Sequence, residues 1–326
     1  MAKIVVRGLR KTFRTPVREA GFLATAKGLF ARRYETVHAL DGIDFEIESG
    51  ELTAYIGPNG AGKSTTVKIL SGILTPDSGE CTVDGRTPWL DRIAHVGRIG
   101  AVFGQRTQLW WDLPVIESLD LLRVIYSVDQ TAYRTRLNDL TDLLGLSALL
   151  DVPARQLSLG QRMRCDLAAA LVHSPSILFL DEPTIGLDAP AKLAVRQFIK
   201  ALNQKDGVTV ILTTHDLDDA EALCNRALVI ANGQIAWDGT LEGLRQRLAP
   251  ERWLTIDFEH LDGDPALDGA ELLERNGLRA SFRYDPAKTP TASLIAQAAA
   301  RYPVADLFVQ NPPIEQWIGQ IYSADR

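Results

Sequence analysis

The sequence predicts an α/β protein with a parallel-sheet core, followed by a small C-terminal α/β domain. Two stretches predict the core. In "YIGPNGAGKSTT" at 55–66, an apolar run meets glycines and then a helical pattern; in "SILFLDEPTIGLD" at 176–188, four apolar residues run into two carboxylates. Such runs are typical of strands buried on both faces of a parallel sheet. Beyond about residue 250, strand-like and helical patterns alternate, which predicts the second domain.

Length and composition restrict the class of protein. The 326 residues fit roughly two domains, and 46% hydrophobic residues, 23% charged residues and a net charge of -6 indicate a folded globular protein without a nucleic-acid partner. Cys81, Cys165 and Cys224 lie far apart without C-x-x-C spacing, so we expect neither a metal site nor a disulfide framework, as fits a reducing cytoplasm. Neither a membrane span nor a signal peptide is expected.

The glycine-rich stretch has the G-x-x-x-x-G-K-S spacing of a phosphate-binding loop. The preceding "ELTAYI" predicts a buried strand and the following "STTVKILSGIL" predicts a helix. Glycines let backbone N–H groups turn toward phosphate oxygens, and a helix N-terminus adds about half a positive charge. We expect Lys63 to reach the outer phosphates and Ser64 to bind Mg²⁺. The expected nucleotide contacts are Gly57, Pro58, Asn59, Gly60, Ala61, Gly62, Lys63, Ser64 and Thr65.

Two carboxylates follow the second apolar run. Ligands bind at the C-terminal ends of strands in open α/β sheets, so we expect Asp181 to hold hydrated magnesium and Glu182 to orient and polarise the attacking water. The alternative is that both residues merely cap a turn before Pro183. The phosphate loop elsewhere in the chain favours the catalytic interpretation.

The stretch "LSLGQRMRCDLAAALVHSP" at 157–175 predicts a helix with a capping residue, Ser158, and a stop at Pro175. Its "LSLGQ" closely resembles the "LSGGQ" signature of the ATP-binding cassette (ABC) ATPases, and it lies shortly before the carboxylate strand, as in that family. The resemblance implies a P-loop NTPase fold of ABC type. That fold has a parallel-sheet core, an antiparallel β-subdomain and an inserted helical subdomain.

Further stretches are similar to the family in the same order along the chain. Gln105 in "AVFGQRTQLWWDLP" matches the glutamine loop, Asp188 ends the D-loop "IGLD", and His215 in "ILTTHD" matches the switch histidine. The resemblance implies that His215 contacts the γ-phosphate, that Gln105 serves catalysis and the magnesium site, and that Asp188 lies at the nucleotide. Phe13 in "RKTF" stands where the family often places an aromatic that stacks on adenine, and Tyr34 is a rival.

The signature residues imply a second copy of the chain. In the family, the signature of one subunit closes over ATP held by the phosphate loop of the other subunit. The resemblance implies this role for Ser158, Gly160 and Gln161, in a head-to-tail dimer around two ATP molecules. Leu159 replaces the first signature glycine, which removes backbone freedom and adds bulk at the lid. We still expect the lid to function.

The resemblance covers about residues 3–245. We expect a cassette over 1–248 with its helical subdomain at 106–156, and an accessory domain over 249–326. "KIVVRGL" and "IDFEIE" predict the antiparallel β-subdomain, and "ALVIANGQIAWDG" predicts a hairpin that turns at Asn232-Gly233. In the tail, "WLTIDF", "LRASFRYD" and "VADLFVQ" predict strands, while "PALDGAELLERNG" and "PTASLIAQAAARY" predict helices.

Residues 14–36 form an insertion in which basic side chains outnumber acidic ones. Apolar positions there share one helical face, which predicts a basic amphipathic helix: Phe22, Ala26, Leu29 and Phe30. Such a helix either docks on a membrane or partner, or covers its own domain. Both interpretations stay open at this point.

The expected function is that of an ATP-hydrolysing subunit of an ABC transporter that drives a separate integral-membrane permease from the cytoplasmic face of the membrane. "FGQRTQLWWDLP" and the tail resemble bacterial exporters of drugs, polysaccharides or ions, while import stays open. The alternatives are ABC ATPases that act on ribosomes or DNA. A single phosphate loop weighs against the former, and the absence of sustained heptads before Asp181 weighs against the latter.

Overall fold

The computed structural model describes residues 2–16, 34–104, 106–247 and 251–310. It divides into two compact units, Met1–Thr240 and Leu241–Arg326. The boundary that we expected after residue 248 falls on 248–250, which lie outside the described residues. Among the described helices, none is long and apolar enough to cross a membrane.

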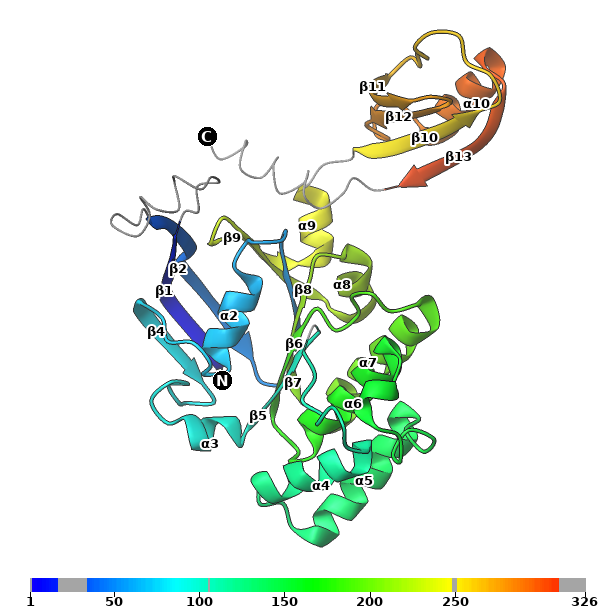
Figure 1. Ribbon diagram of the computed structural model, residues 1–326. Coiled ribbons are helices and arrows are strands. Elements are labelled where there is room, and N and C mark those ends of the chain that lie inside the picture. Colours follow the sequence, from blue (N-terminus) through cyan, green and yellow to red (C-terminus); the bar gives the residue numbers. More distant parts are fainter. Residues whose placement is uncertain (1, 17–33, 105, 248–250, 311–326) are drawn as a thin grey trace, which may run out of the picture. The chain divides into compact units, whose positions relative to one another are not determined.

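The first unit is centred on a six-stranded sheet with the order β5-β6-β7-β3-β8-β9 (Figure 1). The neighbouring strands from β5 to β8 pair in parallel: β5 (Ile99–Phe103), β6 (Ile177–Asp181), β7 (Thr209–Thr214), β3 (Leu52–Ile56) and β8 (Arg226–Ala231). β9 (Gln234–Thr240) returns antiparallel to β8. Asn232 and Gly233 have φ of 47° and 76°, as a type I′ turn requires, which confirms the predicted hairpin.

A second, antiparallel sheet confirms the predicted β-subdomain. It has the order β2-β1-β4, with β1 (Ala2–Pro16), β2 (Tyr34–Glu48) and β4 (Ser78–Val83). The helix α2 (Lys63–Leu70) lies between this sheet and the parallel one (Figure 1). Apolar residues of both sheets and of α2 form one buried cluster, in which the rings of Phe45 and Tyr55 lie 5.8 Å apart. The phosphate loop is therefore anchored between two sheets.

The prediction of a helix over residues 14–36 is wrong at both ends of this insertion, where the structure has strands. β1 continues to Pro16 and β2 begins at Tyr34, with Arg14 opposite Thr36 across the hairpin. Pairing of the two strands satisfies backbone groups that a helix would have to satisfy internally. The middle of the insertion, residues 17–33, lies outside the described residues.

Further helices of the first unit surround the parallel sheet (Figure 1). Their bounds are α3 (Arg92–Val96), α4 (Val115–Ile125), α5 (Gln130–Leu144), the 3₁₀ turn Ala154–Gln156, α6 (Leu159–Leu171), α7 (Ala189–Asp206) and α8 (Leu217–Leu223). α6 and α7 lie on the side of the sheet away from α2, with α4 and α5 beyond them (Figure 1). The segment between β5 and β6 is thus largely helical.

In the described part of the second unit, a four-stranded antiparallel sheet is covered by a helix. After α9 (Leu241–Arg247), the strands follow the order β11-β12-β10-β13. Their bounds are β10 (Arg252–Phe258), β11 (Ala270–Asn276), β12 (Arg279–Tyr284) and β13 (Val304–Gln310). α10 (Thr291–Arg301) buries Leu294 and Ala298 in the same cluster as Leu254 and Phe282. The chain therefore ends in a small α/β domain, as its alternating patterns predicted.

One helix predicted in this unit is wrong. Residues 270–276, within the stretch expected to be helical, form the edge strand β11, with Leu272 opposite Phe282 and Asn276 opposite Arg279. Gly277 has φ of 64° and turns the chain back toward β12. Leu and Glu favour helices, but this preference is small in energy, and strand pairing together with partial burial of Leu272 overrides it.

Candidate functional site

The glycine loop lies between the end of β3 and the start of α2. Gly60 and Gly62 have φ of 82° and 113°, conformations that other residues adopt at a cost. A Cβ atom on Gly57 would lie 2.3 Å from the carbonyl oxygen of Ile230, and one on Gly62 would lie 2.5 Å from that of Ala39. Both glycines are therefore required because neighbouring backbone approaches the loop closely. The tip, Asn59 and Gly60, is exposed.

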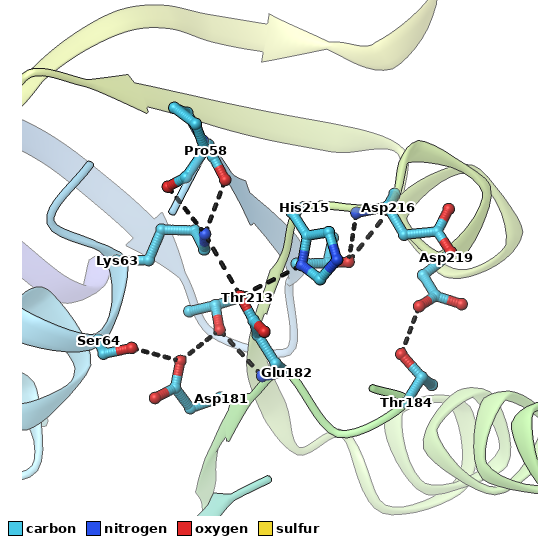
Figure 2. Close-up of polar contacts among 12 residues, drawn as sticks. Pro58, Lys63, Ser64, Asp181, Glu182, Thr184, Thr213, His215, Asp216 and Asp219 are labelled. Carbon is cyan, nitrogen blue, oxygen red and sulfur yellow. Dashed lines mark hydrogen bonds and ion pairs between the residues drawn. The ribbon is translucent and has the colours of Figure 1, made fainter. Parts of the chain in front are cut away.

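Lys63 begins α2 and is buried within this loop, with 5% exposure. Its Nζ donates to the carbonyl oxygens of Gly57 at 2.7 Å and Pro58 at 3.1 Å (Figure 2). The same Nζ lies 3.3 Å from Glu182 Oε1. A buried ammonium needs such partners. The structure therefore brings the lysine of the glycine loop to the carboxylate that follows β6.

Asp181 ends β6 and faces two hydroxyl groups. Its Oδ1 accepts hydrogen bonds from Ser64 Oγ at 3.1 Å and Thr213 Oγ1 at 2.6 Å (Figure 2). Hydroxyl and carboxylate oxygens are ligands that Mg²⁺ prefers. No group of three or more His, Cys, Asp and Glu able to hold a metal occurs within the described residues. A magnesium ion at Ser64 and Asp181 would complete its shell with water and phosphate oxygens, as Mg²⁺ usually does.

Glu182 has an unusual backbone conformation. Its φ is 53°, the left-handed region that costs a non-glycine residue roughly 1–2 kcal/mol. The conformation is held because its N–H donates to Thr213 Oγ1 at 3.0 Å and to the Thr213 carbonyl at 3.2 Å. Thr213 therefore positions both carboxylates. Thr213 was not predicted as a site residue, although two threonines at the end of the apolar run "VILTT" were a visible signal.

His215 follows β7 and faces Glu182. Its Nδ1 lies 3.3 Å from Glu182 Oε1, yet this buried nitrogen makes no hydrogen bond. An unpaired buried polar atom costs about 1–3 kcal/mol, so the imidazole would gain from a polar ligand. The unpaired nitrogen, the glycine loop and the buried ammonium together fit a phosphate ligand.

A buried ion pair supports the turn after Glu182. Thr184 Oγ1 donates to Asp219 Oδ2, and Arg196 Nε donates to Asp219 Oδ1 at 2.7 Å (Figure 2 shows the threonine contact). Asp219 is 1% exposed and lies on α8, while Arg196 lies on α7. This cluster joins the turn to the two helices that follow the D-loop and His215. It was also missed, because it depends on tertiary packing.

The signature residues occupy a different place in the fold. Ser158 and Gln161 form a capping box at the start of α6, with Gln161 N donating to Ser158 Oγ at 3.2 Å and Ser158 N donating to Gln161 Oε1 at 2.9 Å. They line a pocket of about 510 Å³ together with Gly160 and the residues that begin α7. No residue of 57–65 lines this pocket. The structure thus brings Lys63, Ser64, Asp181, Glu182 and His215 together. Within one chain, it does not bring the signature residues next to this group.

The D-loop borders the same pocket. Asp188 caps α7, where its Oδ1 accepts from Ala191 N at 2.9 Å. Leu159 packs on the D-loop, since its Cδ2 lies 3.0 Å from the position that a Cβ on Gly186 would take. The leucine that departs from the family signature therefore contacts the segment that ends at Asp188.

The structure gives fewer contacts for the remaining expected site residues. Phe13 lies on β1 opposite Val37, is 37% exposed and has Lys11 Nζ 5.7 Å from its ring centroid. Thr65 is half-buried in α2. Gln105 and the side chain of Tyr34 lie outside the described parts of the structure. The adenine contact and the glutamine contact therefore stay predictions.

Comparisons with known proteins agree with this geometry. Residues 40–185 match the family described as ABC transporter. The chain is 36% identical over 221 residues to the daunorubicin resistance ATP-binding protein DrrA3 of Streptomyces coeruleorubidus, covering 68% of this chain and 69% of the relative. It is 31% identical over 274 residues to the methionine import ATP-binding protein MetN of Protochlamydia amoebophila (strain UWE25), covering 81% and 79%.

A solved structure is also similar. It is a dimeric ATP-binding cassette in a post-hydrolysis state bound to ADP and Pi, with a TM-score of 0.61 and 28% sequence identity over 73% of this chain and 98% of that one. The strand, glycine loop and helix geometry, the paired carboxylates and these similarities lead to one conclusion: the chain belongs to the ABC transporter family and is an ATP-binding, ATP-hydrolysing subunit.

Proposed function

We propose that the chain hydrolyses ATP at the cluster of Lys63, Glu182 and His215, and that hydrolysis drives a separate integral-membrane permease. The observation that carries this proposal is the position of Glu182 Oε1, which lies 3.3 Å from both Lys63 Nζ and His215 Nδ1. The cluster stands at the C-terminal edge of the parallel sheet, where ligands of open α/β sheets bind.

Each residue has a role that its contacts support. The β- and γ-phosphates enter the glycine loop, and Lys63 exchanges its carbonyl partners for phosphate oxygens. Ser64 and Asp181, with Gln105, would hold Mg²⁺, which would supply positive charge at the phosphates. Glu182 orients the attacking water, and His215 donates to the γ-phosphate. Catalysis proceeds by positioning and charge stabilisation without a covalent intermediate.

A second copy of the chain completes each site. Ser158, Gly160 and Gln161 line a pocket apart from the phosphate loop of their own chain, so the lid over each ATP comes from the partner in a head-to-tail homodimer. Asp188 lies beside this lid. The similarity to a dimeric cassette supports the arrangement. Phe13, on the exposed side of β1, stacks on adenine in this proposal.

The direction of transport is export in our proposal. The similarity to a drug-resistance protein supports export, and the similarity to a methionine import protein is the reason to test it. The chain then lies on the inner face of the cell membrane, bound to its permease. When the chain is coexpressed with a multi-span permease, it should sediment with membranes, whereas an ABC ATPase that acts on ribosomes would sediment with polysomes.

The direct test is the variant Glu182→Gln, analysed by gel filtration with and without ATP. We expect ATP to convert the variant into a dimer, because ATP is bound but not hydrolysed. The matched control is Glu117→Gln, an exposed carboxylate on α4, which should hydrolyse ATP at the wild-type rate. If Glu182→Gln hydrolyses ATP at the wild-type rate, or stays monomeric with ATP, the proposed function is wrong.

A further inference from the structure

A buried carboxylate on the signature helix holds the segment that follows Gln105. Asp166 lies on α6 and is 3% exposed. Its Oδ1 accepts hydrogen bonds from Thr107 Oγ1 at 2.8 Å and from Gln108 N at 2.8 Å. Leu109 N in turn donates to Thr107 Oγ1 at 3.1 Å. One carboxylate oxygen thus organises the consecutive residues 107–109.

The same segment has further attachments on both sides. Gln108 Nε2 donates to the carbonyl oxygen of Ala101, on β5, at 2.7 Å. The guanidinium of Arg162, on α6, lies 5.8 Å from the ring centroid of Trp111. The segment is therefore held between the parallel sheet and α6, and Asp166 supplies its charged contact on the helix side.

The carboxylate is costly for folding. Burial raises the pKa of Asp166 to about 6, although bonds from Gln108 and Thr107 and the charge of Arg162 oppose the rise. A charged group buried without a close cation lowers stability, and groups kept in this state are often functional. The adjacent thiol of Cys165, whose pKa burial raises to about 12, stays neutral over the same pH range.

We propose that Asp166 is a positioning residue that couples the two nucleotide sites of the dimer. Asp166 attaches the segment after Gln105 to α6. In the proposed dimer, Gln105 serves the chain's own ATP, and Ser158 at the start of α6 serves the partner's ATP. This inference rests on the proposed head-to-tail dimer. Because a helix rises 1.5 Å per residue, Asp166 and Ser158 lie about 12 Å apart on one rigid element, so a shift of residues 107–109 moves the lid.

The test uses the full-length chain with Glu182→Gln as background, and measures the ATP concentration that gives half-maximal dimerisation. Adding Asp166→Ala should raise this concentration at least tenfold, and Thr107→Val should raise it in the same direction. Asp166→Asn keeps an acceptor oxygen and should rescue most of the loss. Binding of a fluorescent ATP analogue to the monomer should stay within twofold. Asp142→Ala, an exposed carboxylate on α5, is the matched control and should change neither value.

The pH dependence separates coupling from simple packing. The wild-type carboxylate is the stronger acceptor at pH 8, so the difference between Asp166 and Asp166→Asn in this background should shrink as pH falls to 5.5. This comparison also serves if Asp166→Ala does not fold. If Glu182→Gln itself does not dimerise, the proposed function fails. If it dimerises and the Asp166 and Thr107 variants leave its ATP requirement unchanged, or weaken monomer binding equally, the coupling inference alone is overturned.

Discussion

The phosphate-loop region and the signature region differ in how much of a site one chain provides. Around Lys63, the loop, both carboxylates and His215 converge within one unit, and their contacts are mostly satisfied inside it. Around Ser158, the side chains satisfy each other and leave an open pocket that no residue of the phosphate loop lines. The first region is organised within one chain, and the second completes its partner's nucleotide site in the proposed dimer. Substitutions in the phosphate-loop region should therefore change ATP binding and hydrolysis, and substitutions in the signature region should change dimer assembly.

The largest effect is expected for chemistry in the first region. Glu182→Gln should lower turnover by about 10² to 10⁴, the usual contribution of a positioned general base, or roughly 2.7 to 5.4 kcal/mol of barrier. Steady-state phosphate release measures it. ATP affinity of the monomer should stay close to wild type, because the amide keeps the shape of the side chain. A large loss of affinity with little change in turnover would place Glu182 in binding instead.

Nucleotide binding in the same region should depend on Lys63. Lys63→Ala removes a charged donor from the loop, and hydrogen bonds to charged groups contribute about 1.5–3 kcal/mol, so ATP affinity should fall roughly ten- to hundredfold. Titration with a fluorescent ATP analogue measures the change. Lys200→Ala, an exposed lysine on α7, is the control. Unchanged affinity and turnover in Lys63→Ala would contradict the phosphate-loop assignment.

The signature helix should show a pH effect on stability. Burial raises the folded-state pKa of Asp166 from its usual 3.8 to about 6, so the folded chain binds the proton more tightly than the unfolded chain. Wild-type stability should therefore fall as pH rises from about 4 to about 6 and stay lowered above that. Asp166→Asn lacks this loss and should be more stable by roughly 2 to 3 kcal/mol at pH 7.5, several degrees in Tm.

Thermal melts at several pH values measure this difference. The gain of Asp166→Asn over wild type should shrink to about a third at pH 4.5 and nearly vanish at about pH 3.5. A variant less stable than wild type at pH 7.5, or a difference independent of pH, would show that the hydrogen bonds of the carboxylate outweigh its burial.

The smallest effect is expected at the departure from the family signature. Leu159→Gly restores backbone freedom at the lid and removes the packing on Gly186, so ATPase activity should stay within about tenfold of wild type, some 1.4 kcal/mol of barrier. Leu159→Ala separates the two causes because it removes the packing and keeps the restricted backbone. A greater loss in both variants would show that Leu159 holds the D-loop in its active position.

Local patterns predicted the elements that position the site. The glycines of the loop, the cap at Ser158 and the Asn232-Gly233 turn each reflect a backbone requirement that only a few residue types meet, so their positions could be read from the sequence. The strands of the parallel sheet were equally visible, because burial on both faces leaves a continuous apolar run.

The rest depends on partners that are distant in the sequence. β11 was predicted as a helix because its residues favour helices, and only the pairing with β12 determines its structure. Thr213, Asp166 and Asp219 carry hydrogen bonds to segments 23 or more positions away, and no local pattern marks such residues. The sequence therefore indicated the loop residues of the candidate site, but not the residues that hold them in place.

The left-handed backbone of Glu182 places a limit on how this chain can be improved by selection. At φ of 53°, glycine or asparagine would fit with less strain than glutamate. A library selected only for heat resistance or yield should therefore accumulate glycine or asparagine at this position and lose hydrolysis with it. Engineering for stability must keep this glutamate fixed, because the strained residue is the one that orients the attacking water in the proposed reaction.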